Sequence, residues 1–250
     1  MDKFIVIKPR AGLCNRLRFL FSFIHKMKKE NIKKKLVVIW ELDSQCNGFL
    51  WDIIKPIENC WTLRNNNKNF TINISSCGTV PVYKDCNYLR GLSFKPTTQI
   101  MNNIIKIIKN LNNKYVSIHI RRTDLTNHLK YINKLHLYTK DNDFITFLNK
   151  NTEYNIYLAT DNTETQNKFL KLYPERIKYI KKIDNINNIK NHRKTDLQDA
   201  LTDIFVCALS NKFKGTYYSS FSSFIELIRR DNNIKNNFHN NPLLLTEKYK

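Results

Sequence analysis

The residues best suited to chemistry in this 250-residue chain are two adjacent arginines, Arg121 and Arg122, in the segment HIRRTD at residues 119–124. The segment follows an apolar run from Tyr115 to Ile120 that predicts a buried strand. Two neighbouring arginines at a strand end cannot both point into the core, and a guanidinium presents a rigid fork of N–H donors that matches phosphate oxygens. One arginine could hold a diphosphate while the other pairs with Asp124; a surface ion-pair cluster is the alternative interpretation.

Polar residues follow three other predicted strands. The segment TYYSSFSS at residues 216–223 places Ser219 and Ser220 before an apolar helix, where hydroxyls and free N–H groups favour an anion or form an ordinary N-cap. Asp161 follows the strand Asn155–Ala159, and it also fits a helix cap. The GLCNR turn at residues 12–16 follows the first strand. The carboxyl ends of parallel strands meet at one sheet edge, so these groups are expected to converge on a ligand.

The sequence contains no convincing metal motif. Asp141-Asn142-Asp143 resembles a metal-binding DxD, but it follows Thr139-Lys140 rather than an apolar strand, so a helix cap is the better interpretation. The six cysteines form no CxxC pair and no Cys/His cluster with zinc spacing. Four of them fall between residues 46 and 86, which leaves disulfides open in an oxidising compartment. We expect no metal and no other cofactor.

The elements that must position these groups alternate between strands and helices. Predicted strands cover residues 4–8, 36–42, 115–120, 155–159, 176–180 and 212–216; predicted helices cover 17–27, 100–111, 143–148, 164–172, 197–208 and 220–229. Residues 43–95 are expected to be irregular, with Pro56, Pro81 and scattered Asn. This order predicts an α/β fold with mostly parallel sheets covered on both faces.

Net charge is the unusual feature of the composition. The chain has 42 Lys and Arg against 21 Asp and Glu, a formal charge of +21, which favours an anionic partner: nucleic acid, acidic lipid or a phosphorylated small molecule. The basic runs are scattered and show no regular interleaving with aromatic residues, unlike a stacking platform for single strands. The N-terminus has no apolar signal-peptide region, and no stretch is long enough to span a bilayer, so the chain is expected to be soluble and cytoplasmic.

Taken together, four segments resemble motifs of the fucosyltransferase superfamily that contains the α1,2, α1,6 and protein-O types. They are GLCNRL at 12–17, HIRRTD at 119–124, YLATDN at 157–162 and the long segment at 203–224, and their order and approximate spacing match over most of the chain. HxRRxD is the most specific of the four. The resemblance implies a GT-B-like fold of two Rossmann-like lobes, the N-terminal one small. We expect an N-terminal acceptor-side lobe at 1–112, a nucleotide-sugar-binding lobe at 113–230, and a C-terminal tail at 231–250 that packs back or is flexible.

The resemblance also implies roles for individual residues. Arg121 matches the motif arginine that holds the donor β-phosphate and is the expected catalytic residue. The other donor-site positions are His119 and Asp203 near guanosine, Ser219 and Ser220 as phosphate-binding hydroxyls, Asp161 as a motif acid, and Arg122 and Asp124. Asn15, with Gly12 and Arg16 beside it, matches a motif near the cleft between the lobes, on the acceptor side.

One departure from the family pattern concerns the proton acceptor. In the α1,6 branch the motif Asp is followed by a Lys and then by a Glu that serves as base, but these positions are Leu125 and Leu129 here. An α1,6 core-type activity is therefore not expected. Four candidates for the base remain open: His128, Asp43, Glu41 and Asp161.

The expected function is inverting, metal-independent transfer of fucose from GDP-fucose to a hydroxyl of a glycan or sugar acceptor. The partners are then a nucleotide sugar and a glycan, without a specific nucleic acid. Two alternatives are a basic nucleic-acid-binding protein and a catalytically silent module that binds a GDP-sugar or glycan.

Overall fold

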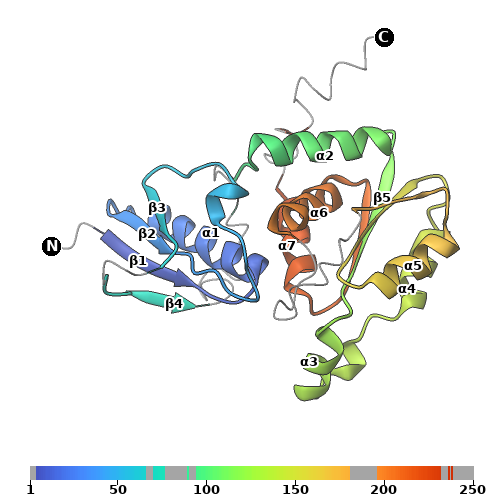
Figure 1. The fold of residues 1–250 in the computed structure, drawn as a ribbon, viewed down its shortest axis with the longest axis horizontal. Coiled ribbons are helices and arrows are strands. Elements are labelled where there is room, and N and C mark those ends of the chain that lie inside the picture. The colour runs from blue at the N-terminus through green and yellow to red at the C-terminus, as the bar shows by residue number, and fades with distance from the viewer. Residues whose placement is uncertain are drawn as a thin grey trace, which may run out of the picture.

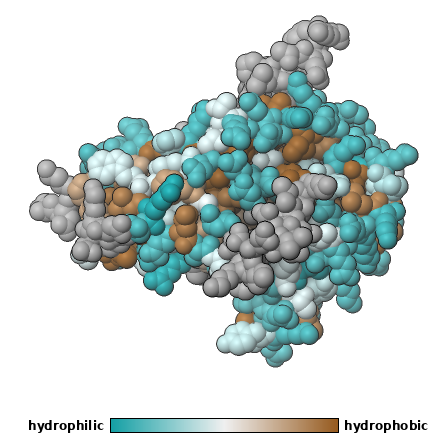
Figure 2. Space-filling view, in the orientation of Figure 1, coloured by the Kyte–Doolittle hydropathy of each residue, from teal (hydrophilic) through white to brown (hydrophobic). Residues whose placement is uncertain are grey.

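The computed structural model describes residues 4–65, 70–76, 89, 94–180, 196–231, 236 and 238. Two four-stranded sheets, all of whose strand pairs are parallel, organise the fold. The α/β prediction with two parallel sheets is therefore confirmed. On the face that Figure 2 shows, hydrophilic residues cover much of the coloured surface, and apolar residues show in small groups between them.

The first sheet has the strand order β3-β2-β1-β4. Its elements are β1 (Phe4–Pro9), α1 (Leu13–Lys29), β2 (Lys35–Ile39), the 3₁₀ helix η1 (Leu50–Asp52), β3 (Cys60–Leu63) and β4 (Ile74–Ser76). Helix α1 begins directly after the turn at Gly12, and its buried side includes Leu13, Leu17 and Leu20. Lys26, Lys28 and Lys29 lie in its last turn, where positive charge suits the helix dipole.

The second sheet has the order β7-β6-β5-β8. Its region contains α2 (Thr98–Asn110), β5 (Tyr115–Ile120), α3 (Leu125–Tyr131), η3 (Leu135–Leu137), α4 (Asp141–Asn149), β6 (Asn155–Thr160), α5 (Thr163–Leu172), β7 (Ile177–Lys178), α6 (Leu197–Leu209), β8 (Lys212–Gly215) and α7 (Ser220–Arg229). Every residue of β5 is buried, because α4 and α5 cover one face of the sheet and α6 covers the other (Figure 1). A central strand is thus shielded on both sides, as the continuous apolar run predicts.

A shared hydrophobic core joins the two sheets. Helices α6 and α7 lie between α1 and the second sheet (Figure 1), and α1 contacts α7 directly. The ring of Phe94 lies 4.7 Å from Phe21 of α1, 5.2 Å from Phe205 of α6 and 5.9 Å from Phe224 of α7, measured between ring centroids. Phe238, from the predicted tail, is also buried against Phe205. This aromatic cluster fixes the β1–α1 turn relative to the carboxyl ends of the second sheet.

Several elements differ from the sequence-based expectation. Residues 43–95 were expected to be irregular, but β3 and β4 lie there and pair with β2 and β1. The loop expected after β5 contains α3 and η3, and the helix expected at residue 143 begins at Asp141. The expected boundary between the two lobes, at 112/113, falls in the turn between α2 and β5. Helix α2 lies before this boundary but packs on α6, which lies after it, so the division into lobes stays a prediction.

Candidate functional site

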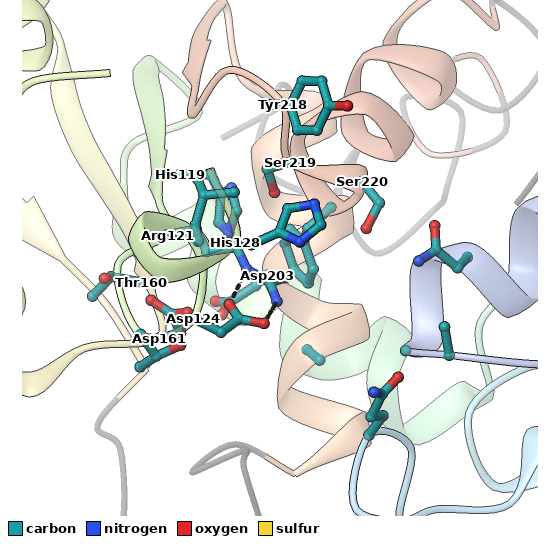
Figure 3. A pocket seen from close by; sticks show the side chains of 18 residues that line it. His119, Arg121, Asp124, His128, Thr160, Asp161, Asp203, Tyr218, Ser219 and Ser220 are labelled. Atoms are coloured by element: carbon teal, nitrogen blue, oxygen red, sulfur yellow. Dashed lines mark hydrogen bonds and ion pairs between the residues drawn. The ribbon is translucent and has the colours of Figure 1, made fainter. Parts of the chain in front are cut away.

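A cavity of about 570 Å³ lies where the β1–α1 turn faces the carboxyl ends of the second sheet (Figure 3). It is lined by Ala11, Gly12, Asn15 and Gln45 from the first sheet's side, and by His119, Arg121, Thr123, Asp124, Leu125, His128, Thr160, Asp161, Ala200, Asp203, Tyr218, Ser219, Ser220 and Phe221. Nine of the eleven site residues expected from sequence belong to this lining; Arg16 and Arg122 do not. The four motif segments therefore converge on one space, as parallel topology predicts.

Arg121 forms a bidentate ion pair with Asp124 at the cavity wall. Its Nε donates to Oδ1 at 2.8 Å and its Nη2 donates to Oδ2 at 2.6 Å. Burial opposes the charged guanidinium, but the hydrogen bonds and charge of Asp124, together with Asp161, raise the pKa of Arg121 above its ordinary value. An arginine has five N–H donors, so this pair leaves three for a ligand. Asp124 thus orients the guanidinium without exhausting its donors.

Arg122 has a different environment and does not line the cavity. Its Nη2 donates to Asp141 at 2.6 Å, and its guanidinium lies 4.7 Å from the ring centroid of Tyr138. Lys168 shares Asp141 at 2.6 Å. Burial opposes ionisation of Asp141, but hydrogen bonds from Lys168 and Arg122 lower the pKa of that carboxyl. The side chain of Arg122 therefore anchors α4 outside the cavity lining, and Arg121 is the arginine that pairs with Asp124.

The N-terminus of α7 faces the cavity with a ready-made set of polar groups. Ser219 is the N-cap, and its hydroxyl accepts from the N–H of Ser222; Ser220 is the first helical residue. His119 Nδ1 hydrogen-bonds Ser222 Oγ at 2.7 Å, and its ring stacks on Phe221 with centroids 4.5 Å apart. Strand β5 and helix α7 are thus joined at the site. The sequence analysis did not name Ser222 as a site residue. Its place three residues after the N-cap Ser219, in the first turn of a helix that faces the cavity, could have indicated it.

A glycine permits this close joint between strand and helix. A Cβ added at Gly215 would lie 2.6 Å from Cβ and 2.7 Å from Oγ of Ser222. Contacts this short do not occur, so any larger residue would displace α7 or Ser222. Tyr218, three residues on, has a φ of 62° and lines the cavity. A positive φ is unusual for a bulky residue, and such strain is concentrated at functional sites.

Two further carboxylates of the cavity are held by hydrogen bonds. Asp161 accepts from the N–H of Arg122 at 2.9 Å and from the Thr123 hydroxyl at 2.6 Å. Asp203 is buried and accepts from the Tyr157 hydroxyl at 2.6 Å. Burial and the negative charge of Asp203 raise the pKa of Tyr157 well above its ordinary value, so the tyrosine remains a donor.

On the opposite wall, Gly12 and Asn15 line the cavity but Arg16 points into the protein. Arg16 is almost fully buried: its Nε donates to the carbonyl of Ala11 at 2.6 Å, its Nη1 to the carbonyl of Glu41, and its Nη2 to Asp43 at 2.5 Å. Ala11 has a left-handed φ of 65°. Arg16 therefore holds the shape of the β1–α1 turn, and its side chain is not part of the cavity lining.

Metal-ligating side chains do not cluster in the described part of the chain. No group of three or more His, Cys, Asp or Glu side chains there could hold a metal ion. Asp143 accepts from the N–H of Lys140 at the start of α4, so the DND segment is the helix cap that the sequence favours. Cys14, Cys46, Cys60 and Cys207 are buried free thiols, while Cys77 and Cys86 lie outside the described residues. No helix in the described part is long and apolar enough to cross a membrane.

Comparison with known proteins adds a family and a fold. The model of the GDP-fucose protein O-fucosyltransferase family matches residues 14–232. No curated protein matches by sequence. Among solved structures, the chain is similar to a NodZ alpha-1,6-fucosyltransferase soaked with GDP-fucose, with TM-score 0.60 and 13% identity over 91% of this chain and 93% of the other. NodZ from Bradyrhizobium gives the same values. POFUT1 in complex with GDP-fucose gives TM-score 0.60 and 10% identity over 92% and 95%.

Proposed function

Because the chain belongs to the GDP-fucose protein O-fucosyltransferase family, and is thus a glycosyltransferase, we propose that it transfers fucose from GDP-fucose to a glycan or sugar hydroxyl. We further propose that the reaction inverts the anomeric configuration and needs no metal ion. The observation that carries this proposal is the convergence of Arg121 and the α7 N-terminus on one cavity.

Arg121 and the N-terminus of α7 suit the diphosphate part of the donor best. When the bond from fucose to GDP breaks, negative charge grows on the β-phosphate and must be stabilised. Arg121 offers the N–H groups that Asp124 leaves free, and α7 offers backbone N–H groups of its first turn, with roughly half a positive charge from its dipole. The hydroxyls of Ser219 and Ser220 complete the set. Donors fixed in advance in this way need little rearrangement during the reaction.

The remaining cavity residues divide between guanosine and the acceptor. His119 and Asp203 are buried on the β5 and α6 side, and we assign them to the guanosine part of the donor. Gly12 and Asn15 lie on the opposite wall, and we assign them to the acceptor side. The acceptor oxygen would then attack the fucose carbon from the face opposite the diphosphate, which gives inversion.

The experiment that tests the proposal has two arms. In the first, we expect GDP to raise the melting temperature of the wild-type chain in EDTA more than UDP or ADP does, and Arg121→Ala to abolish the increase. Arg230→Ala is the matched control, because Arg230 is an exposed arginine at the other end of α7. In the second arm, GDP-fucose is incubated with a glycan array in EDTA, and transferred fucose is detected.

The outcomes separate the proposed function from its alternatives. Transfer in EDTA supports a metal-independent enzyme. If GDP, UDP and ADP all leave the melting curve unchanged, the donor site is wrong. GDP binding with neither transfer nor hydrolysis would indicate a silent binding module. Submicromolar, structure-selective binding of nucleic acid at physiological salt would favour the alternative that the charge suggests.

A further inference from the structure

One side chain of the cavity has no part in the donor site described above. His128 projects from α3 into the same space as Arg121, Ser219 and Ser220 (Figure 3). Its helix begins where the Arg121–Asp124 pair ends, so its position is tied to the proposed phosphate site. The ring of Tyr218 lies 6.3 Å from the imidazole, centroid to centroid. An exposed imidazole that lines the proposed reaction cavity is suited to accept a proton.

The carboxylates that could compete for this role are already engaged. Asp43 binds Arg16 and Glu41 binds Lys8, and neither lines the cavity. Asp161 accepts from a backbone N–H and from the Thr123 hydroxyl. Protonation of any of these carboxylates would weaken a hydrogen bond or ion pair that it accepts in the structure.

The other titratable groups of the cavity are held in the same way. Both oxygens of Asp124 bind Arg121, and Asp203 accepts from Tyr157. His119 has one ring nitrogen on Ser222 and one ring face on Phe221. For the side chain of His128, the described part of the chain shows the ring contact with Tyr218 and no hydrogen bond.

We propose that His128 is the general base that takes the proton from the acceptor hydroxyl; this rests on the proposed fucosyl transfer. The acceptor oxygen forms a bond to the anomeric carbon of fucose while its proton passes to a ring nitrogen of His128. The bond from that carbon to the β-phosphate oxygen breaks, and its electron pair leaves with GDP. The proton is later released to solvent, which restores the neutral imidazole.

Charged and titratable groups from several elements surround His128. These groups are Asp124 and Lys130 on its own helix, Lys134 after α3, Arg121 at the end of β5, Asp161 at the end of β6 and Tyr218 before α7. Only the neutral ring can act as a base. Turnover is therefore expected to fall in acid, and this fall should depend on residue 128.

The test measures GDP release from GDP-fucose with water as the acceptor, so no glycan needs to be identified first. General base catalysis contributes about 10²–10⁴-fold, and we expect His128→Gln to lower kcat about 100-fold. The Kd for GDP should stay within about twofold, since the donor groups are unchanged. Added imidazole should restore activity to His128→Ala, and the acidic fall of the pH profile should disappear in both variants.

His136→Gln is the matched control, because His136 is an exposed histidine of the neighbouring η3 that does not line the cavity. It should leave kcat and the pH profile unchanged. A His128→Gln variant with the wild-type kcat and pH profile would overturn the proposal while the fucosyl transfer stands. A wild-type chain that neither releases GDP with water as the acceptor nor transfers fucose to any glycan of the array would instead overturn the proposed function, and the role of His128 with it.

Discussion

Replacing Arg121 by lysine keeps the positive charge of the proposed phosphate site but removes its fork of donors. In the structure the guanidinium donates two hydrogen bonds to Asp124, which leaves three N–H groups for a ligand. A lysine ammonium has three N–H groups in all, so the same pair with Asp124 would leave one. The change therefore removes two donors from the diphosphate while the net charge of the cavity stays the same.

The expected loss follows from these two donors. Removing one preorganised donor to a developing negative charge costs about 10²–10³ in rate, so the loss of two in Arg121→Lys should lower kcat for GDP-fucose turnover by about 10⁴. GDP in the ground state loses less, since two hydrogen bonds to a charged group contribute about 1.5 kcal/mol each, and the roughly 3 kcal/mol together correspond to a Kd weaker by about 10². The rate should thus fall further than the affinity.

The assay measures GDP release from GDP-fucose for kcat and titration calorimetry for the Kd of GDP, both in EDTA. Asp124→Asn is a useful companion, because an amide oxygen can still accept from Nε of Arg121 and hold the fork in place. We expect it to lose about tenfold in kcat, the value of roughly one hydrogen bond to a charged group. If Arg121→Lys turns over GDP-fucose within threefold of the wild-type rate, the fork geometry does not matter and the reasoning is refuted.

Three other predictions concern the framework of the site. Arg16→Met should lower the free energy of unfolding by about 3 kcal/mol, because two backbone carbonyls lose a charged donor inside the protein. The melting temperature should fall by roughly 6–12 °C while GDP still binds. An unchanged melting temperature would contradict the structural role of Arg16. Gly215→Ala should weaken GDP binding at least about tenfold, since the methyl group of the alanine overlaps Ser222 and shifts the α7 N-terminus. A wild-type Kd for GDP, measured by titration calorimetry on this variant, would show that the Gly215–Ser222 contact does not affect the site. Burial raises the pKa of the Cys60 thiol to about 12, so at pH 8 iodoacetamide should modify Cys60 only after unfolding, as peptide mass mapping would report; rapid modification of the native chain would contradict it.

The strand-end motifs could be predicted because they depend on local pattern. The apolar run of β5 ends at the arginines, and the Ser-rich turn ends β8, so parallel topology alone brings them to one edge. Short elements without such a pattern could not be predicted. Strand β4 has only three residues, and its pairing with β1 is decided by tertiary contacts.

The direction of individual arginines could not be predicted either. Arg121 and Arg122 have the same charge and adjacent positions, but Arg122 reaches Asp141 and the ring of Tyr138, which are far along the chain and close only in the fold. Arg16 lies beside the cavity residue Asn15, yet the carbonyls of Ala11 and Glu41 draw it inward. Such choices depend on partners supplied by other elements.

The chain's positive charge alone did not identify the site. Of the 42 Lys and Arg residues, Arg121 is the one described residue of either type that lines the cavity. The same lining contains three acidic residues, Asp124, Asp161 and Asp203. A diphosphate held by one oriented guanidinium and a helix N-terminus fits this composition better than a long polyanion does.

The most direct test of the account is a crystal structure of the chain with GDP bound in EDTA. We expect diphosphate oxygens within hydrogen-bonding distance of the Arg121 guanidinium and of the N-terminal N–H groups of α7, with Asp124 still paired to Arg121. The guanine should lie on the His119 and Asp203 side of the cavity. A diphosphate bound elsewhere, or bound in this cavity without contact to Arg121, would contradict the account.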